Sequence, residues 1–132
     1  MTHISQNSYE LINQSSKKCL VRPSHIIIHN NNKYIITIGK NAIDNWKIID
    51  DAESDDIWCH LENMPSSHVI IHSCDKKEIM KDLIYRAAIM CKKHSKSSKV
   101  KNVNVIYTMI KNVKKANDIG SVTTTCVKRI IV

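Results

Sequence analysis

Two short runs rich in isoleucine, placed on either side of three asparagines, constrain the fold of this chain more than any other feature. Residues 25–29 read His-Ile-Ile-Ile-His, and residues 33–38 read Lys-Tyr-Ile-Ile-Thr-Ile. Isoleucine favours strands, and asparagine tolerates the positive φ angles of tight turns. The pattern predicts a β-hairpin that turns at residues 30–32 and ends at Gly39.

A second strand pair and one long helix follow in the sequence. Residues 57–61 and 68–72 are apolar runs around a loop that contains Pro65. Asp75 is expected to cap a helix, because Glu78 three residues later completes a capping box. Apolar residues then recur at helical intervals to about residue 95.

Shorter elements complete the expected fold. Residues 42–49 fit a short helix, residues 103–108 alternate as a strand does, and residues 122–132 fit one or two terminal strands. The fold class is therefore predicted to be α+β, a mostly antiparallel sheet with the helix over residues 75–95 packed on one face.

The length and composition indicate one domain inside the cell. We expect a polar N-terminal extension over residues 1–24 and a single domain over residues 25–132 of the 132-residue chain. No apolar run approaches the roughly 18 residues of a membrane span, and no secretory signal is visible. The five cysteines form no CxxC pair, so reduced thiols and a cytoplasmic location are expected.

The net charge of +8 is concentrated in the last third of the chain. Residues 1–91 hold ten Lys and Arg against eleven Asp and Glu, whereas residues 92–132 hold ten against Asp118 alone. Such asymmetry indicates a polyanionic partner for the C-terminal third. The alternative is a mildly basic surface with no specific partner.

Eight lysines carry this charge, and we expect them to contact nucleic-acid phosphates. They are Lys92, Lys93, Lys96, Lys99, Lys101, Lys111, Lys114 and Lys115. Residues 92–115, which hold these lysines, contain no arginine, which argues against bidentate reading of guanine and favours recognition of shape or backbone. The lysines alone do not separate RNA from DNA, and an anionic membrane surface would also attract them.

A cluster of aromatic and histidine residues forms a second candidate site. Trp58 and His60 share one face of their strand, and His68 and His72 share one face of the next. The strand register decides whether the two sets meet. A metal site, a histidine acid–base pair, a structural hydrogen-bonded cluster and direct ligand contact all fit. The zinc spacings of closed sites are not matched, so we predict no metal and no cofactor.

Catalysis has weak support in the sequence. Cys59 adjoins His60, but neighbours on a strand point to opposite faces, which prevents a direct Cys–His pair. The acidic run over residues 50–56 fits a solvated connector. We therefore expect a binding protein rather than an enzyme.

Six short motifs occur together in a characteristic order. They are Gly39-Lys40-Asn41-Ala42, Asp56-Ile57-Trp58-Cys59-His60, Pro65-Ser66-Ser67-His68-Val69, Arg86-Ala87-Ala88, Val103-Asn104-Val105-Ile106-Tyr107-Thr108 and Val113-Lys114-Lys115. In order and spacing they resemble the NFACT-R domain, the C-terminal module of ribosome quality-control proteins of the NEMF and fibronectin-binding-protein type. Cys59 stands where the family has an aromatic residue, and Ser66 where it has glycine.

The resemblance implies an α+β domain that contacts RNA, chiefly tRNA on the ribosome, without catalysis of its own. It implies a family-like centre formed by Asp56, Trp58, His60, Pro65, His68 and Tyr107. We therefore predict binding of structured RNA, either tRNA or ribosomal RNA, with the large ribosomal subunit as a further partner. The alternatives are an RNA-modifying enzyme or nuclease centred on His60 and His68, and a DNA-binding or protein-interaction module.

Overall fold

A computed structural model describes residues 19–132. In chain order the strands are β1 (His25–His29), β2 (Asn32–Ile38), β3 (Ile57–Leu61), β4 (Val69–Ser73), β5 (Asn104–Met109), β6 (Val113–Lys115), β7 (Val122–Thr124) and β8 (Lys128–Ile131). The helices are α2 (Ala42–Asp50), α3 (Lys81–Lys93) and the 3-10 turn η1 (Ile110–Asn112).

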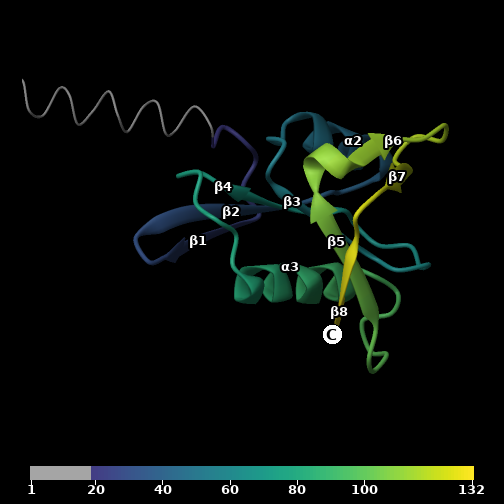
Figure 1. Cartoon of the computed structure of the whole chain (residues 1–132). Helices are drawn as coiled ribbons and strands as arrows, with labels where there is room; N and C mark the ends of the chain where they lie inside the picture. The colour runs from purple at the N-terminus through teal and green to yellow at the C-terminus, as the bar shows by residue number, and fades with distance from the viewer. Residues whose placement is uncertain (1–18) are drawn as a thin grey trace, which may run out of the picture.

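Six strands form one sheet in the order β1-β2-β4-β3-β5-β8, and every neighbouring pair is antiparallel. The hairpin of β6 and β7 stands apart from this sheet. Figure 1 shows α3 across one face of the sheet, with α2 and the β6–β7 hairpin on the other side. The predicted α+β class and mostly antiparallel sheet are confirmed.

The alternation of side chains along β3 separates the two faces of the sheet. Ile57, Cys59 and Leu61 pack with Ala87 and other residues of α3 in the main core. Trp58 instead packs with Ile48 and Ile49 of α2, in the cluster on the opposite face. The faces therefore differ in kind, because the face under α3 holds the main apolar core, whereas the other face carries Trp58, His60 and His68.

The hairpin predicted at the asparagines is confirmed. Asn30 and Asn31 have φ angles of 51° and 64°, in the left-handed region that asparagine tolerates. Ile26 lies opposite Ile35 in the β1–β2 register. The short helix expected over residues 42–49 is also present as α2, where Asn41 caps the first turn by accepting from the Asp44 N–H at 2.8 Å.

The main helix is present but begins later than the capping box predicted. It starts at Lys81, after Met80, which makes no side-chain cap. The Asp75 carboxylate instead accepts from the Lys33 main-chain N–H at 2.8 Å, and Lys76 has a positive φ angle of 53°. The competing contact with β2 thus takes the capping group away from the helix.

The segment before β1 is tied to the sheet. Cys19 forms a disulfide with Cys74, which lies just after β4, so the expectation of reduced thiols is wrong for this pair. The Arg22 guanidinium binds the Asp44 carboxylate with contacts of 2.7 and 2.9 Å. Residues 19–24, which the sequence placed in a polar extension, therefore pack on the fold, and residues 1–18 of that extension lie outside the described residues.

Candidate nucleic-acid interface

The end of β3 and the start of β4 open into a hollow of about 920 Å³ that we call the histidine groove. Four separate segments line it: residues 39–45, 60–68, 93–97 and 119–121. Its lining includes three lysines and three histidines, Lys40, Lys93, Lys96, His60, His68 and His94, and no Asp or Glu. The groove is therefore a place of unbalanced positive charge.

The floor of the histidine groove is a buried pair formed by Trp58 and His68. Because β3 pairs with β4 so that Trp58 faces Ile70, the alternate residues His60 and His68 fall on the same face of the sheet. The Trp58 Nε1–H donates to His68 Nδ1 at 3.0 Å. The register that the sequence left open therefore brings the two histidines together.

This hydrogen bond fixes the tautomer of His68. Indole nitrogen is a donor only, so the Nδ1 of a neutral His68 must accept and its proton must sit on Nε2. The His68 side chain is 4% exposed and belongs to the groove lining, and the described residues give its Nε2–H no acceptor. The groove thus contains a hydrogen-bond donor of fixed orientation that is available to a ligand.

Both histidines of the floor are held in the neutral form. Burial lowers the pKa of His68 from 6.5 to about 3, with a further contribution from His60. Burial also lowers the pKa of His60, although main-chain contacts with Leu61 and Ser66 oppose the shift. His60 Nδ1 lies 2.6 Å from the Leu61 carbonyl oxygen, and its ring stacks on Trp58 at 5.7 Å. This arrangement suits positioning and hydrogen bonding better than proton transfer near neutral pH.

The two glycines of the chain both stand in the groove wall. A Cβ on Gly39 would lie 1.8 Å from the Asn45 Oδ1, and one on Gly120 would lie 2.8 Å from the Ala42 Cα. Gly120 also has a φ of 88°. These contacts bring the start of α2 against the β6–β7 turn, where the Trp46 Nε1–H donates to the Ser121 carbonyl at 2.9 Å.

The N-terminus of α2 adds positive potential to the same wall. Lys40, Asn41 and Ala42 line the groove, and the macrodipole of a helix is positive at its N-terminus. The acid of this turn, Asp44, is bound by Arg22, which lowers the pKa of its carboxyl to about 2. The Asp44 carboxylate beside this wall is thus neutralised by its own partner.

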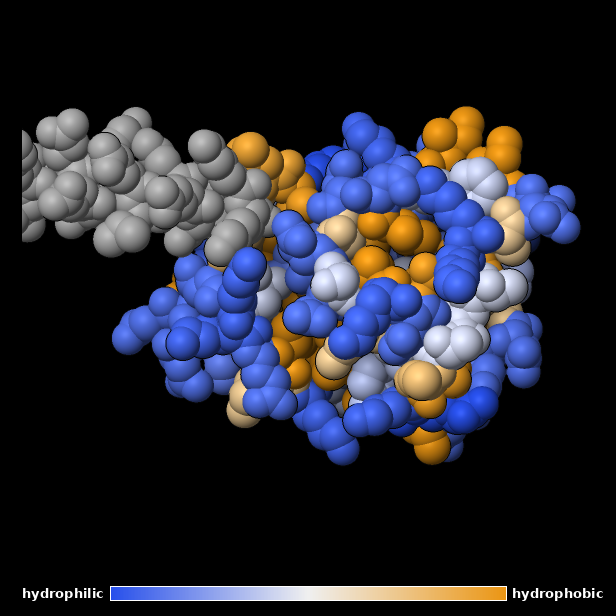
Figure 2. Space-filling view, turned by 45° about the horizontal axis from the view of Figure 1, so that its top comes forward, coloured by the Kyte–Doolittle hydropathy of each residue, from blue (hydrophilic) through white to orange (hydrophobic). Residues whose placement is uncertain are grey.

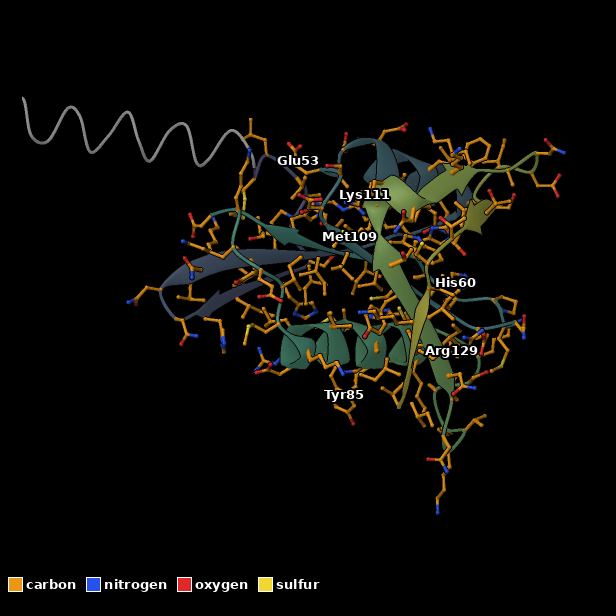
Figure 3. The ribbon with its side chains drawn as sticks, viewed as in Figure 1. Glu53, His60, Tyr85, Met109, Lys111 and Arg129 are labelled. Atoms are coloured by element: carbon orange, nitrogen blue, oxygen red, sulfur yellow. A yellow bond between two sulfur atoms is a disulfide. The ribbon has the colours of Figure 1, made fainter. Side chains whose placement is uncertain are left out.

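The structure does not gather the eight predicted lysines into one patch. Lys93 and Lys96 line the histidine groove. Lys92 donates to the Val132 carbonyl at 3.1 Å, and Lys99, Lys101 and Lys114 are exposed elsewhere. Lys111 lies 3.6 Å from Asp55, and Lys115 lies 2.7 Å from Asp50. Figure 3 shows Lys111 at the upper end of β5, well apart from His60.

The predicted motif residues also divide between sites. Trp58, His60, Pro65 and His68 belong to the groove or its floor. Asp56 lies at the other end of β3, where its carboxylate is 2.7 Å from His72 Nδ1. Tyr107 faces away from the groove, in the core beside α3.

A second hollow of about 790 Å³, which we call the acidic hollow, lies at this other end of β3. It is lined by four lysines and four acids, Lys76, Lys77, Lys81, Lys128, Glu53, Asp55, Asp56 and Glu78, over a floor that includes Ile57, Met80 and Met109. Figure 2 shows hydrophilic side chains framing apolar ones on one face of the molecule. In Figure 3, Glu53, Met109 and Lys111 mark the end of the molecule that holds the acidic hollow.

Several groove residues were not predicted from the sequence. Lys40, Asn45 and Gly120 are distant in sequence from the lysine-rich segment and join it only in the fold. The scarcity of glycine was a signal that could have found part of this set, because a chain with two glycines places them where other residues do not fit. Within residues 19–132, no group of three His, Cys, Asp or Glu side chains is placed to hold a metal ion.

The family to which the chain belongs follows from its sequence match. Residues 13–127 match the family described as NFACT protein RNA binding domain. The chain belongs to this family. The NFACT-R match thus covers the groove segments and most of the sheet, and it confirms the resemblance seen in the motifs.

Relatives of this NFACT-R chain are longer proteins. It is 34% identical to coiled-coil domain-containing protein 25 of Bos taurus over 93 residues, which cover 67% of this chain and 45% of the relative. It is 39% identical to the Rqc2 homolog RqcH of Bacillus subtilis over 83 residues, covering 62% of this chain and 14% of RqcH. The chain therefore spans less than half the length of these relatives.

A solved structure shares the fold. The C-terminal part of the fibronectin/fibrinogen-binding protein from Streptococcus suis superposes with a TM-score of 0.72 and 25% identity. The superposition covers 85% of this chain and 45% of that chain. In the part of the chain that is described here, no helix is both long enough and apolar enough to cross a membrane.

Proposed function

We propose that this NFACT-R domain binds RNA in the histidine groove. The observation that carries the proposal is the lining of the groove, where three lysines surround a buried Trp58–His68 pair and no acid is present. Phosphates need positive charge more than exact geometry, and lysine supplies a flexible point charge. Membership of a family described as RNA binding supports the same assignment.

The floor of the groove supplies the part of the site that is not electrostatic. The His68 Nε2–H is a neutral donor, which can bind a ribose hydroxyl or a base oxygen. A 2′-hydroxyl is the group that distinguishes RNA from DNA at a contact of this kind. We therefore expect the lysines to give affinity and His68 to favour RNA.

The identity of the RNA is a further part of the proposal. We propose structured RNA, either tRNA or ribosomal RNA, met on the large ribosomal subunit in ribosome quality control. The support is the similarity to RqcH, which is named as a homolog of Rqc2, and the scarcity of arginine near the groove, which disfavours base reading.

A ribosomal role also requires a location in the cytoplasm, which we include in the proposal. The Cys19–Cys74 disulfide opposes this location, because disulfides are rare in reducing compartments. Reduction of the bond in the cell would remove the conflict, since Cys19 and Cys74 lie outside the groove lining.

Binding measured across a salt series tests the proposal. The ligands are tRNA, single-stranded RNA and duplex DNA, and the variant is Lys40→Ala with Lys93→Ala and Lys96→Ala. We expect preference for RNA and a salt slope shallower by about 2 in the variant, because each lost contact to a single strand removes about 0.7.

The acidic hollow provides a matched control. Lys77→Ala with Lys81→Ala and Lys128→Ala removes the same number of charges from exposed positions, so the net charge of the two triple variants is equal. We expect this control to keep most of the affinity and slope. Equal losses in the two variants, or no binding to RNA at low salt, would contradict the proposal. Tighter binding of duplex DNA than of either RNA would assign the groove to DNA.

A further inference from the structure

A second depression continues from the histidine groove along α3. This depression of about 430 Å³, which we call the α3 trough, lies between α3 and the edge strand β1. It is lined by His25, Ile26, Ile27, Arg86, Ile89, Met90, Lys93 and His94. Lys93 and His94 line both the trough and the groove, so the two depressions meet at the C-terminal end of α3.

The α3 trough has the same charge character as the groove but a different floor. Arg86 and Lys93 are its charged residues, and no acid lines it. Its remaining surface is largely apolar, from Ile26, Ile89 and their neighbours. An apolar strip with an unbalanced basic edge is complementary to a ligand that combines flat apolar groups with a row of negative charges.

An exposed aromatic side chain stands beside this trough. Tyr85 precedes Arg86 on α3 and lies one turn before Ile89, and it is 45% exposed. Of the Trp and Tyr residues in the range 19–132, Tyr85 is the one that is exposed. In Figure 3 its ring points away from the sheet, at the outer surface of α3. Exposed aromatic rings next to basic residues form stacking platforms for unpaired bases.

We propose that a single-stranded extension of the bound RNA leaves the histidine groove at Lys93 and continues along the α3 trough. Arg86 and Lys93 contact its phosphates, and Tyr85 with Ile89 receives an unpaired base. This inference rests on the proposed function, because it extends the same bound RNA. It makes the ligand a structured RNA with an unpaired end or loop rather than a fully paired helix.

The direction of the path follows from charge balance. On the other side of the molecule, Lys111 and Lys115 face Asp55 and Asp50. A phosphate there would have to compete with a carboxylate already in place. The lining of the trough holds no acid, and Asp82, an exposed residue one turn before Arg86 on α3, lies outside that lining. We therefore expect the RNA strand to continue from the groove along α3.

A length series of oligonucleotides tests this path. Oligoribonucleotides of about 4 and about 12 nucleotides bracket the site sizes of small single-strand binding modules. We expect the longer oligomer to bind the wild-type chain about tenfold more tightly. In Arg86→Glu with Tyr85→Ser, this gain should disappear while binding of the short oligomer is unchanged. Both residues are exposed, so the variant should fold.

Lys81→Glu, on the same helix but in the acidic hollow, reverses one charge as Arg86→Glu does, and this matched control should keep the length gain. If the wild-type chain binds both oligomers equally, or if the double variant still binds the longer one more tightly, the proposed path along the trough is wrong. Neither result contradicts RNA binding in the groove. A wild-type chain that binds neither oligomer nor tRNA overturns the proposed function itself. Equal binding of an acidic peptide that is lost in the double variant assigns the trough to protein and also overturns the RNA path.

Discussion

The two hollows at the ends of β3 hold comparable numbers of lysines but differ in their acids. The histidine groove has three lysines and no acid, whereas the acidic hollow has four lysines and four acids. Each end also buries one histidine of the β4 region. His68 is bound by the neutral Trp58 indole, and His72 is bound by the Asp56 carboxylate.

The difference shows that the number of lysines in a segment does not locate an anion site. A lysine beside a carboxylate contributes little to a distant ligand, because the two charges cancel within a few ångströms. An anion site needs lysines whose neighbours leave the charge uncompensated. The predictions below alter the histidine groove and the paired lysines outside it, beginning with the largest expected effect.

Gly120→Ala should disrupt the groove wall, where the β6–β7 turn contacts the start of α2. The new Cβ would lie 2.8 Å from the Ala42 Cα, at a φ of 88° that alanine disfavours. We expect the free energy of unfolding to fall by about 3 kcal/mol, from backbone strain and overpacking together. Denaturant titration measures the loss. Ile119→Ala, at the exposed neighbouring position, is the control and should change stability little.

His68→Gln should flatten the dependence of stability on pH. The folded pKa of His68 is about 3, below its ordinary value of 6.5, so the unfolded chain binds the extra proton between these values. Stability is therefore complete above pH 6.5 and falls as the pH is lowered, by about 2 kcal/mol at pH 5. The variant should lose this part of the slope and keep the part that comes from the lowered pKa of His60.

Unfolding at pH 7 and at pH 5 separates the two effects of His68→Gln. Loss of the Trp58 hydrogen bond lowers stability equally at both values, whereas the proton linkage appears only at pH 5. A variant with the wild-type slope would show that His68 is not held neutral in the folded chain.

Ser67→Asp should make the histidine groove resemble the acidic hollow. Ser67 lines the groove, and its hydroxyl makes no hydrogen bond in the described structure. One carboxylate there should weaken RNA binding about tenfold, or about 1.4 kcal/mol. Ser67→Asn matches the size without the charge and should bind as the wild type does. Equal weakening by both variants would assign the effect to shape.

Removal of the two lysines that form ion pairs with Asp55 and Asp50 should have the smallest effect on RNA affinity. Lys111→Ala with Lys115→Ala should change RNA affinity less than about twofold, because these lysines already face Asp55 and Asp50. Lys93→Ala with Lys96→Ala removes the same charge from the groove and should weaken binding about tenfold. Similar losses in the two variants at equal salt would show that pairing with a carboxylate does not decide which lysines bind RNA.

Local signals in the sequence predicted the fold well. The asparagine turn, the β-branched runs and the alternation in β3 depend on neighbours along the chain, and the structure confirms them. The start of α3 was not predicted because Asp75 bonds to Lys33, which is 42 residues away. The Cys19–Cys74 bond joins residues 55 apart and has no local signature either.

The candidate site was predicted only in part for the same reason. Trp58, His60 and His68 were identified because strand alternation groups them. Counting lysines along the chain included Lys111 and Lys115, whose partners Asp55 and Asp50 belong to an acidic run that looked like a separate connector. Charge balance depends on which residues are neighbours on the folded surface, and a count of lysines along the chain does not reveal those neighbours.

The assembly of the groove from four distant segments has a consequence for the folding of the chain. Residues near 40, 60, 95 and 120 must all be in place before a ligand meets a complete site. Contacts of such high sequence separation slow folding, because the entropy of closing long loops must be lost before the contacts form. A ligand that binds only the finished groove then raises the free energy of unfolding, by about 2.7 kcal/mol when its concentration is 100 times its dissociation constant. Binding would therefore report whether a newly made chain has completed its fold.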